Sequence, residues 1–139
     1  MPIRKELYPT DWRRISNEVR AAADWRCQDC GARHLQIIRR TGRPEQQGQY
    51  LVDWEVVIEI TETNGEKVLA SSLSAKRRRF HGITKVIIST AHLDRDPGNN
   101  ERENLGAKCQ RCHFRYDMRQ IVRSKQYGRN YDQQPQLFN

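Results

Sequence analysis

Two Cys-x-x-Cys pairs constrain the fold of this chain more than any other feature. The first pair is Cys27 and Cys30, the second is Cys109 and Cys112, and His113 follows directly. Structural zinc prefers four tetrahedral ligands, and each short pair can present two thiolates to one ion. Buried free thiols and a thioredoxin-like redox pair are the alternatives, but two matched pairs would require two redox sites. The spacing therefore predicts one structural zinc ion bound by all four cysteines.

A long insertion must lie between the two pairs. They are separated by 78 residues, whereas compact zinc modules place about 15–20 residues between their pairs. Because the free-energy cost of closing a loop grows only with the logarithm of its length, such an insertion is tolerated. The 139-residue chain is also polar, with a mean hydropathy of -0.95. A bound metal would stabilise a domain that has so few apolar side chains for its core.

The pattern of apolar residues predicts an α+β fold. Apolar side chains recur at helical spacing in residues 11–24, and residues 110–124 form a second expected helix. Runs rich in β-branched and aromatic residues predict strands. These strands are expected at residues 34–40, 50–61, 67–73 and 85–90.

Turn and loop residues divide the rest of the chain. Asn64 and Gly65 have the pattern of a two-residue hairpin turn. Glycine and proline in residues 41–49 predict a loop, and residues 76–79 are expected to form a basic tip or linker. The expected organisation is one domain over residues 1–125, an inserted β-hairpin at about 42–82, and a flexible polar tail over residues 126–139.

The charge of the chain indicates the kind of partner it binds. The formal net charge is +8 and the isoelectric point is about 9.7, and such a basic excess indicates a polyanion, with nucleic acid first. A merely solubilising surface is the alternative, which the clustering of the basic residues disfavours. The candidate DNA contacts are Lys76, Arg77, Arg78, Arg79, Arg95, Arg111, Arg115 and Arg119.

The sequence predicts no membrane segment and no secretory signal. No apolar run reaches the length of about 18 residues that a spanning helix requires, and the first six residues lack the apolar stretch of a signal peptide. We therefore expect a reducing cellular interior, in which thiolates bind metal and do not form disulfides.

One stretch of the chain resembles a known family. Ala91-His92-Leu93-Asp94 is followed by Glu103-Asn104-Leu105, then by Cys109-Gln110-Arg111-Cys112-His113, and then by Tyr116-Asp117. This order of His, Asn and His fused to a cysteine pair resembles the HNH endonucleases, above all phage and bacterial members. The match covers about residues 86–118, and the helix before the first cysteine pair is similar too. It implies a ββα-metal core in a metal-dependent endonuclease that cleaves double-stranded DNA in the cytoplasm of a bacterial or phage-infected cell.

The candidate catalytic residues also make chemical sense. Phosphodiester hydrolysis requires a base that activates water and a cation at the scissile phosphate. His92, at a strand end, is the candidate base because imidazole titrates near neutral pH. His113 and Asp117 are four residues apart on a helix, so they share a face and could hold one divalent ion. The resemblance assigns the same roles to His92 and His113, and makes Asn104 the middle residue of the family name. We expect Asn104 to fasten the intervening loop so that His92 keeps its orientation, whereas in some family members the equivalent residue binds metal.

One position departs from the family pattern. The residue before the base is commonly an Asp or His that binds the metal, and here it is Ala91. Asp94 could take its place, because in an extended backbone it points to the same side as His92. Otherwise water and phosphate complete the coordination of a magnesium or manganese ion, or zinc or nickel binds through His113. Ala91 also supports the alternative function, a catalytically decayed zinc-stabilised DNA-binding module.

The end of the chain carries a separate motif. Gln134-Pro135-Gln136-Leu137-Phe138 is similar to the Gln-x-x-Leu-Phe peptides with which bacterial replication proteins dock on the sliding clamp. Gln134, Leu137 and Phe138 are then the partner-binding residues, because a Leu-Phe anchor on a polar tail suits insertion into a pocket. A disordered tail is the alternative, since five residues match by chance often enough.

Overall fold

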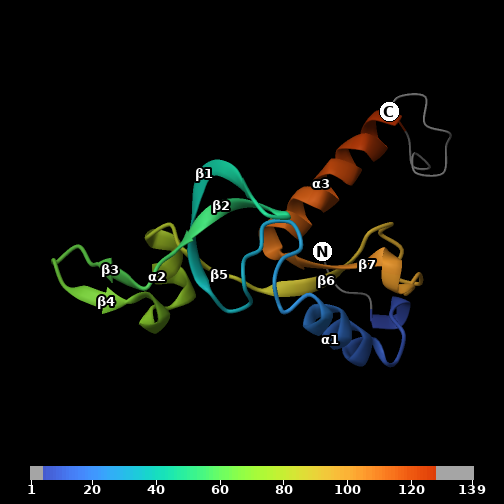
Figure 1. Ribbon diagram of the computed structural model, residues 1–139, viewed down its shortest axis with the longest axis horizontal. Coiled ribbons are helices and arrows are strands. Elements are labelled where there is room, and N and C mark those ends of the chain that lie inside the picture. The colour runs from blue at the N-terminus through green and yellow to red at the C-terminus, as the bar shows by residue number, and fades with distance from the viewer. Residues whose placement is uncertain (1–4, 128–139) are drawn as a thin grey trace.

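A computed structural model describes residues 5–127 of the chain, and the predicted clamp motif lies outside them. Within these residues the fold is α+β, as predicted, with three small antiparallel sheets and their helices (Figure 1). None of the helices among them is both long and apolar enough to cross a membrane.

The N-terminal helix α1, Trp12–Ala22, agrees with the prediction to within two residues at each end. Val19 is its buried residue, on the face that packs against the sheet formed by β6 and β7. Just past the end of the helix, Asp24 and Trp25 adopt positive φ angles of 56° and 54°. This left-handed turn redirects the chain from the helix to the first cysteine pair.

The segment predicted as a loop at residues 41–49 is mostly strand. Strand β1, Ile37–Gln47, continues through it and pairs with β2, Tyr50–Val56. Gly42 and Pro44 fall within the shift in register between Arg40 and Glu45, where a strand tolerates them. The prediction failed because most side chains here are exposed, so backbone pairing, not burial, holds the strand.

The predicted strand at residues 50–61 is two strands in different sheets. After β2 the chain leaves this sheet and forms β3, Glu59–Thr61, which pairs with β4, Lys67–Leu69. The turn between them has three residues, not two, because the Glu62 N–H donates to the Glu66 carbonyl at 2.7 Å. Gly65, with φ +86°, supplies the left-handed residue that this turn requires.

The basic run at residues 76–79 is helical. It lies in α2, Ala75–Phe80, whose first turn is capped by Ser74, because the Ser74 hydroxyl accepts from the Arg77 N–H at 3.2 Å. A short 3-10 turn, Ala70–Ser72, ends the return strand early and leads into this helix. Strand β5, Thr84–Lys85, then brings the chain back to β1.

The C-terminal part is a strand pair followed by a helix. Strand β6, Ile88–His92, pairs with β7, Leu105–Cys109, and α3, Gln110–Tyr127, begins without an intervening loop. In Figure 1, α3 projects away from the rest of the molecule, and β3, β4 and α2 form a lobe at the opposite end.

Helices α1 and α3 lie on opposite faces of the β6–β7 pair. Thr90 in β6 bonds Ser16 of α1, with 2.9 Å between the two hydroxyl oxygens. The preceding residue, Ser89, lies 3.1 Å from His113 Nδ1 in α3. Because consecutive strand residues point to opposite faces, the two contacts define the two sides of the pair.

Candidate functional site

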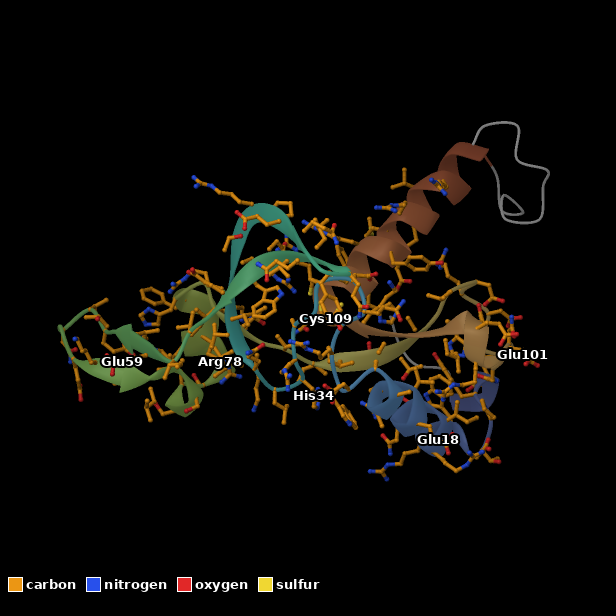
Figure 2. All side chains as sticks on the ribbon, viewed as in Figure 1. Glu18, His34, Glu59, Arg78, Glu101 and Cys109 are labelled. Carbon is orange, nitrogen blue, oxygen red and sulfur yellow. The ribbon has the colours of Figure 1, made fainter. Side chains whose placement is uncertain are left out.

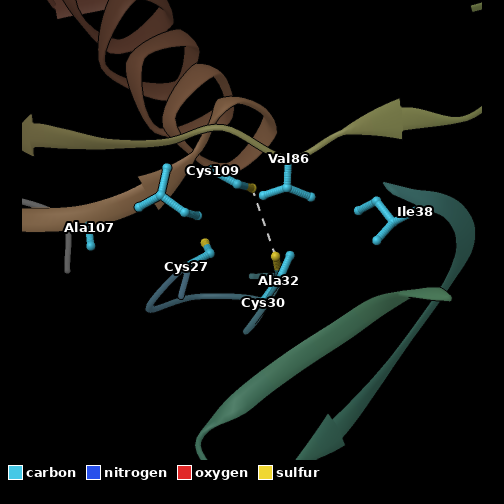
Figure 3. Close-up of a cluster of buried hydrophobic side chains, with 8 residues drawn as sticks. Cys27, Cys30, Ala32, Ile38, Val86, Ala107 and Cys109 are labelled. Carbon is cyan, nitrogen blue, oxygen red and sulfur yellow. Dashed lines mark hydrogen bonds between the residues drawn. The ribbon is translucent and has the colours of Figure 1, made fainter. Parts of the chain in front are cut away.

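The four cysteines come together as predicted and could hold a metal ion. Their sulfur atoms all lie within 4.8 Å of one another, and Cys30 Sγ lies 3.8 Å from Cys109 Sγ (Figure 3). Tetrahedral thiolate ligands about 2.3 Å from zinc lie about 3.8 Å from one another, so the cluster fits a structural zinc ion. Cys27, Cys30 and Cys109 are buried and Cys112 is partly buried.

Backbone hydrogen bonds shape the first cysteine pair and join it to the second. The Gly31 N–H donates to the Cys27 carbonyl at 2.8 Å, and the Gln28 N–H donates to the Ala107 carbonyl at 2.9 Å. The second bond ties the pair to β7, the strand that ends in Cys109. Gly31 has φ +75°, and a Cβ there would approach the Tyr50 ring to 2.9 Å. Only glycine suits this turn.

The thiols of the second cysteine pair have pKa values that are shifted in opposite directions. Hydrogen bonding with Cys112, and then with Cys27, holds the pKa of Cys109 far below its usual value. The contact with Cys109 raises the pKa of Cys112 in turn. A metal ion bound by thiolates replaces these protons, so metal affinity falls as the pH falls.

Arg40 of the insertion completes the surroundings of the sulfur atoms. Its guanidinium lies 3.6 Å from Cys30 Sγ and 3.3 Å from Cys109 Sγ, and it forms an ion pair of 2.7 Å with Asp53. The other Asp53 oxygen lies 3.0 Å from Arg111 of α3. Four thiolates around a divalent ion carry an excess negative charge, which a guanidinium in this position offsets.

The sequence analysis missed both Arg40 and Asp53. The available signal was the carboxylate of Asp53 in an otherwise apolar run, Tyr-Leu-Val-Asp-Trp. Such a carboxylate is buried only when it has cationic partners, and Asp53 is 7% exposed. Its partners Arg40 and Arg111 lie 13 and 58 positions away in the chain, so only the tertiary structure identifies them.

The predicted pair on α3 is brought together. His113 Nε2 lies 3.5 Å from Asp117 Oδ2, and both side chains are about one third exposed. His113 Nδ1 faces the Ser89 hydroxyl at 3.1 Å, which orients the imidazole ring. The pair is therefore accessible and positioned, with carboxylate and imidazole on one side of the helix.

His92 lies on the other face of the strands. Its ring stacks on Trp12 of α1, with ring centroids 4.8 Å apart and an interplanar angle of 21°, and its Nε2 lies 3.0 Å from Asn100 Oδ1. His113 contacts Ser89 on the α3 face, so the two histidines do not share a face. At the end of the strand pair, the Tyr116 hydroxyl of α3 donates to the Leu93 carbonyl.

Asn104 fastens the loop after His92, as predicted. Its amide nitrogen donates to Asp94 Oδ1 at 2.9 Å and to the Asn99 carbonyl at 2.8 Å. Its amide oxygen accepts from the Asp94 N–H at 3.0 Å. Side chain and backbone of Asn104 together close the loop between β6 and β7.

Asp94 is engaged within that loop. It accepts hydrogen bonds from Asn99 at 2.7 Å and from the Asp96 N–H at 2.8 Å, in addition to Asn104. Burial raises the pKa of Asp94, but these hydrogen bonds outweigh it and bring the pKa below its usual value. Among the described residues, only the four cysteines form a group of three or more potential ligands. Asp94, His113 and Asp117 are accordingly not grouped closely enough to form such a set of three in the described part of the chain.

Ala91 occupies the position where the family pattern has a ligand. It is two residues from Ser89 in β6 and so shares the α3 face with it. Its methyl group is buried, with 1% exposed. A carboxylate here would point to the side of the strands that bears His113.

The predicted DNA contacts lie at two ends of the molecule. Arg77 pairs with Glu62 and Arg78 donates to the Leu73 carbonyl, both within the β3–β4 lobe. Figure 2 shows Arg78 well away from Cys109 and α3. Lys76 and Arg79 are exposed on the same helix α2. Four further predicted contacts, Arg95, Arg111, Arg115 and Arg119, lie in the loop after β6 or on α3.

Comparison of the chain with protein-family models, with curated proteins and with solved structures finds no match.

Proposed function

We propose that the protein is a metal-dependent endonuclease of the HNH type that hydrolyses DNA phosphodiester bonds and is stabilised by a structural zinc ion. The observation that carries this proposal is the position of His113 and Asp117. They lie 3.5 Å apart in the first two turns of α3, and that helix begins between two cysteines of the metal centre. The same residues carry the resemblance to the family.

Each proposed catalytic residue has a defined task. His92 accepts the proton of the attacking water, and the Asn104-fastened loop keeps the end of β6 in place. His113 and Asp117 would hold the catalytic ion, and Ser89 orients the histidine ring. A magnesium or manganese ion bound there would supply positive charge to the scissile phosphate. Basic residues of α3, Arg115 and Arg119, contribute attraction to the DNA backbone.

A DNA-binding module without catalytic activity is the second candidate. Two observations favour it: Ala91 offers no ligand on the α3 face, and His92 packs against Trp12 on the opposite face from His113. In that case the zinc centre and the basic surface would remain while hydrolysis is lost.

A plasmid-nicking assay separates the two candidates. Wild-type protein, His92→Ala and His113→Ala are compared with magnesium, with manganese and without added metal, and His81→Ala serves as the control histidine in the distant lobe. We expect nicking by wild type and by the control, and a loss of at least 100-fold in both site variants. Nicking that survives His92→Ala contradicts the assigned base.

The variant Ala91→Asp tests the departure from the family pattern directly. If the α3 face holds the catalytic ion, a carboxylate at this position adds a ligand, and the metal concentration for half-maximal nicking falls. Ala91→Asn is the matched control, since it has the same shape without the charge. No metal-dependent nicking by wild type or Ala91→Asp, together with intact DNA binding, establishes the second candidate.

A further inference from the structure

A pocket of about 270 Å³ lies between the β1–β2 hairpin and α3. Pro44 and Leu51 line it from the hairpin, and Arg115, Tyr116 and Arg119 line it from the helix. The hairpin belongs to the insertion between the cysteine pairs. The insertion therefore builds one wall of a surface hollow together with the helix that carries the proposed catalytic pair.

The pocket is lined by more cationic than anionic side chains, and two of its arginines have no carboxylate partner among the described residues. Its two carboxylates already have cationic partners: Asp53 lies between Arg40 and Arg111, and Asp29 pairs with Lys108. Arg115 and Arg119 also line the pocket, and neither forms an ion pair with a described residue. The pocket thus combines ion-paired groups with two further guanidinium groups that lie one helical turn apart.

The pocket and the proposed catalytic pair lie on different sides of α3. Arg111, Arg115 and Arg119 recur every four residues and share one side, whereas His113 is two residues after Arg111. Two residues correspond to about 200° around the helix axis. An anion in the pocket is therefore not the phosphate that His113 and Asp117 would contact.

We propose that this hairpin–α3 pocket binds a backbone phosphate of DNA, away from the scissile bond, through Arg115 and Arg119. Guanidinium groups present paired donors to phosphate oxygens, and the apolar wall formed by Leu51, Pro44 and the Tyr116 ring suits the adjoining sugar. The DNA ligand rests on the proposed function, but the pocket itself does not require catalysis. The insertion then serves to hold substrate.

The first test removes the two charges. Binding of a fluorescent 20-bp duplex is measured by anisotropy across a salt series without added divalent metal, for wild type and for Arg115→Gln/Arg119→Gln. We expect the slope of log K against log salt to become shallower by about 2, one for each lost phosphate contact. The control Arg13→Gln/Lys67→Gln removes the same net charge from exposed positions elsewhere. An equal change of slope in both double variants overturns the proposal.

The second test fills the pocket without changing its charge. Leu51→Trp inserts a large ring at a position that is 51% exposed, and Leu69→Trp is the control on β4 at a position that is 55% exposed. We expect at least a fivefold loss of DNA affinity in the first variant alone, with equal zinc content and melting temperature in both. Equal affinity of the two variants also overturns the pocket.

The nicking assay distinguishes a failure of the pocket from a failure of the proposed function. Wild type that cleaves DNA, with pocket variants that bind like their controls, refutes the pocket and keeps the nuclease. Wild type that does not cleave, with pocket variants that lose binding, refutes the nuclease and keeps the pocket. Wild type that binds no DNA at all refutes both.

Discussion

The molecule has two apolar cores that are stabilised in different ways. The core around the four-cysteine cluster, here called the metal core, contains eight buried residues, three of which are cysteines. The core of the lobe contains four, Val57, Ile60, Ala70 and Ile83, without a cysteine or a charged group. Sequence separation explains the difference: the first core joins segments from both ends of the domain, and the second joins residues within one insertion. A metal site is useful where the chain must close over a long distance, and apolar contacts suffice where it does not.

Strand β1 connects the two cores. Ile38 is fully buried in the metal core, whereas its neighbour Ile37 packs against the lobe core. Adjacent residues of a strand point to opposite faces, so one strand serves both. A slip of one residue in the pairing of β1 would exchange the two side chains, and this fixes the register.

Removing the metal should have the largest effect. Structural zinc contributes about 10 kcal/mol or more of apparent folding free energy, comparable with the whole stability of a typical domain. A chelator, or Cys109→Ser, should therefore unfold the metal core, and the lobe should follow because β1 is shared. Hydrogen exchange of β6–β7 and β3–β4 amides measures both cores at once. Unchanged exchange and melting after complete metal removal would show that the thiols are structural without metal.

The metal core should depend only weakly on the stability of the lobe core. Ile60→Ala removes a side chain that is 7% exposed, and we expect the lobe to lose about 2 kcal/mol, since a small cluster can partly collapse around the cavity. Zinc content should remain one ion per chain. Ile58→Ala, at a position that is 72% exposed, is the control and should change stability by less than about 0.5 kcal/mol. Loss of zinc in the Ile60 variant would mean that the two cores unfold as one.

The variant Arg40→Met tests whether β1 strengthens metal binding at the four-cysteine cluster. Arg40→Met removes the hydrogen bonds to Cys30 and Cys109 but keeps an unbranched side chain. Losing such an outer partner typically costs about 10-fold in metal affinity, so zinc should transfer faster to a competing chelator. Arg39→Met, an exposed neighbour paired with Glu55, is the control. Equal transfer rates for the two variants would assign Arg40 to the ion pair with Asp53 alone.

The smallest effect is expected at the helix cap in the lobe. Ser74→Ala removes the acceptor of the Arg77 N–H and should cost about 1 kcal/mol of local stability. Faster exchange of the α2 amides, with no change at the metal core, is the expected result. Ser71→Ala, four residues before the start of α2, changes an exposed position and should leave the exchange unchanged. An equal increase of α2 amide exchange in both variants would show that Ser74 does not cap the helix.

Local patterns predicted the parts of the fold that local physics decides. The spacing of the four cysteines predicted that they cluster, and helical periodicity located α1. The strand through Gly42 and Pro44 was missed because only its pairing with β2 stabilises it. The i, i+4 spacing brought His113 and Asp117 together.

Long-range packing decided what the sequence could not predict. Alternation along β6 puts His92 and Ser89 on opposite faces, but only the tertiary packing shows that α1 covers the His92 face, where Trp12 stacks on the ring. The spacing from His92 suggested Asp94 as a metal ligand, and the structure shows that its carboxylate accepts hydrogen bonds within the loop that Asn104 closes. Arg40 reaches the sulfur atoms only because β1 runs beside the first cysteine pair.

Strand β7 runs directly into α3, so the four-cysteine cluster lies at the base of a long helix. Cys109 ends the strand and Cys112 lies in the first turn of the helix, so a metal ion bound by both sulfur atoms would constrain the direction in which α3 leaves β7. A helix of 18 residues is about 27 Å long, and a tilt of about 10° at its start displaces its far end by about 5 Å. Small changes at the cysteines therefore become large displacements of the arginines farther along the helix.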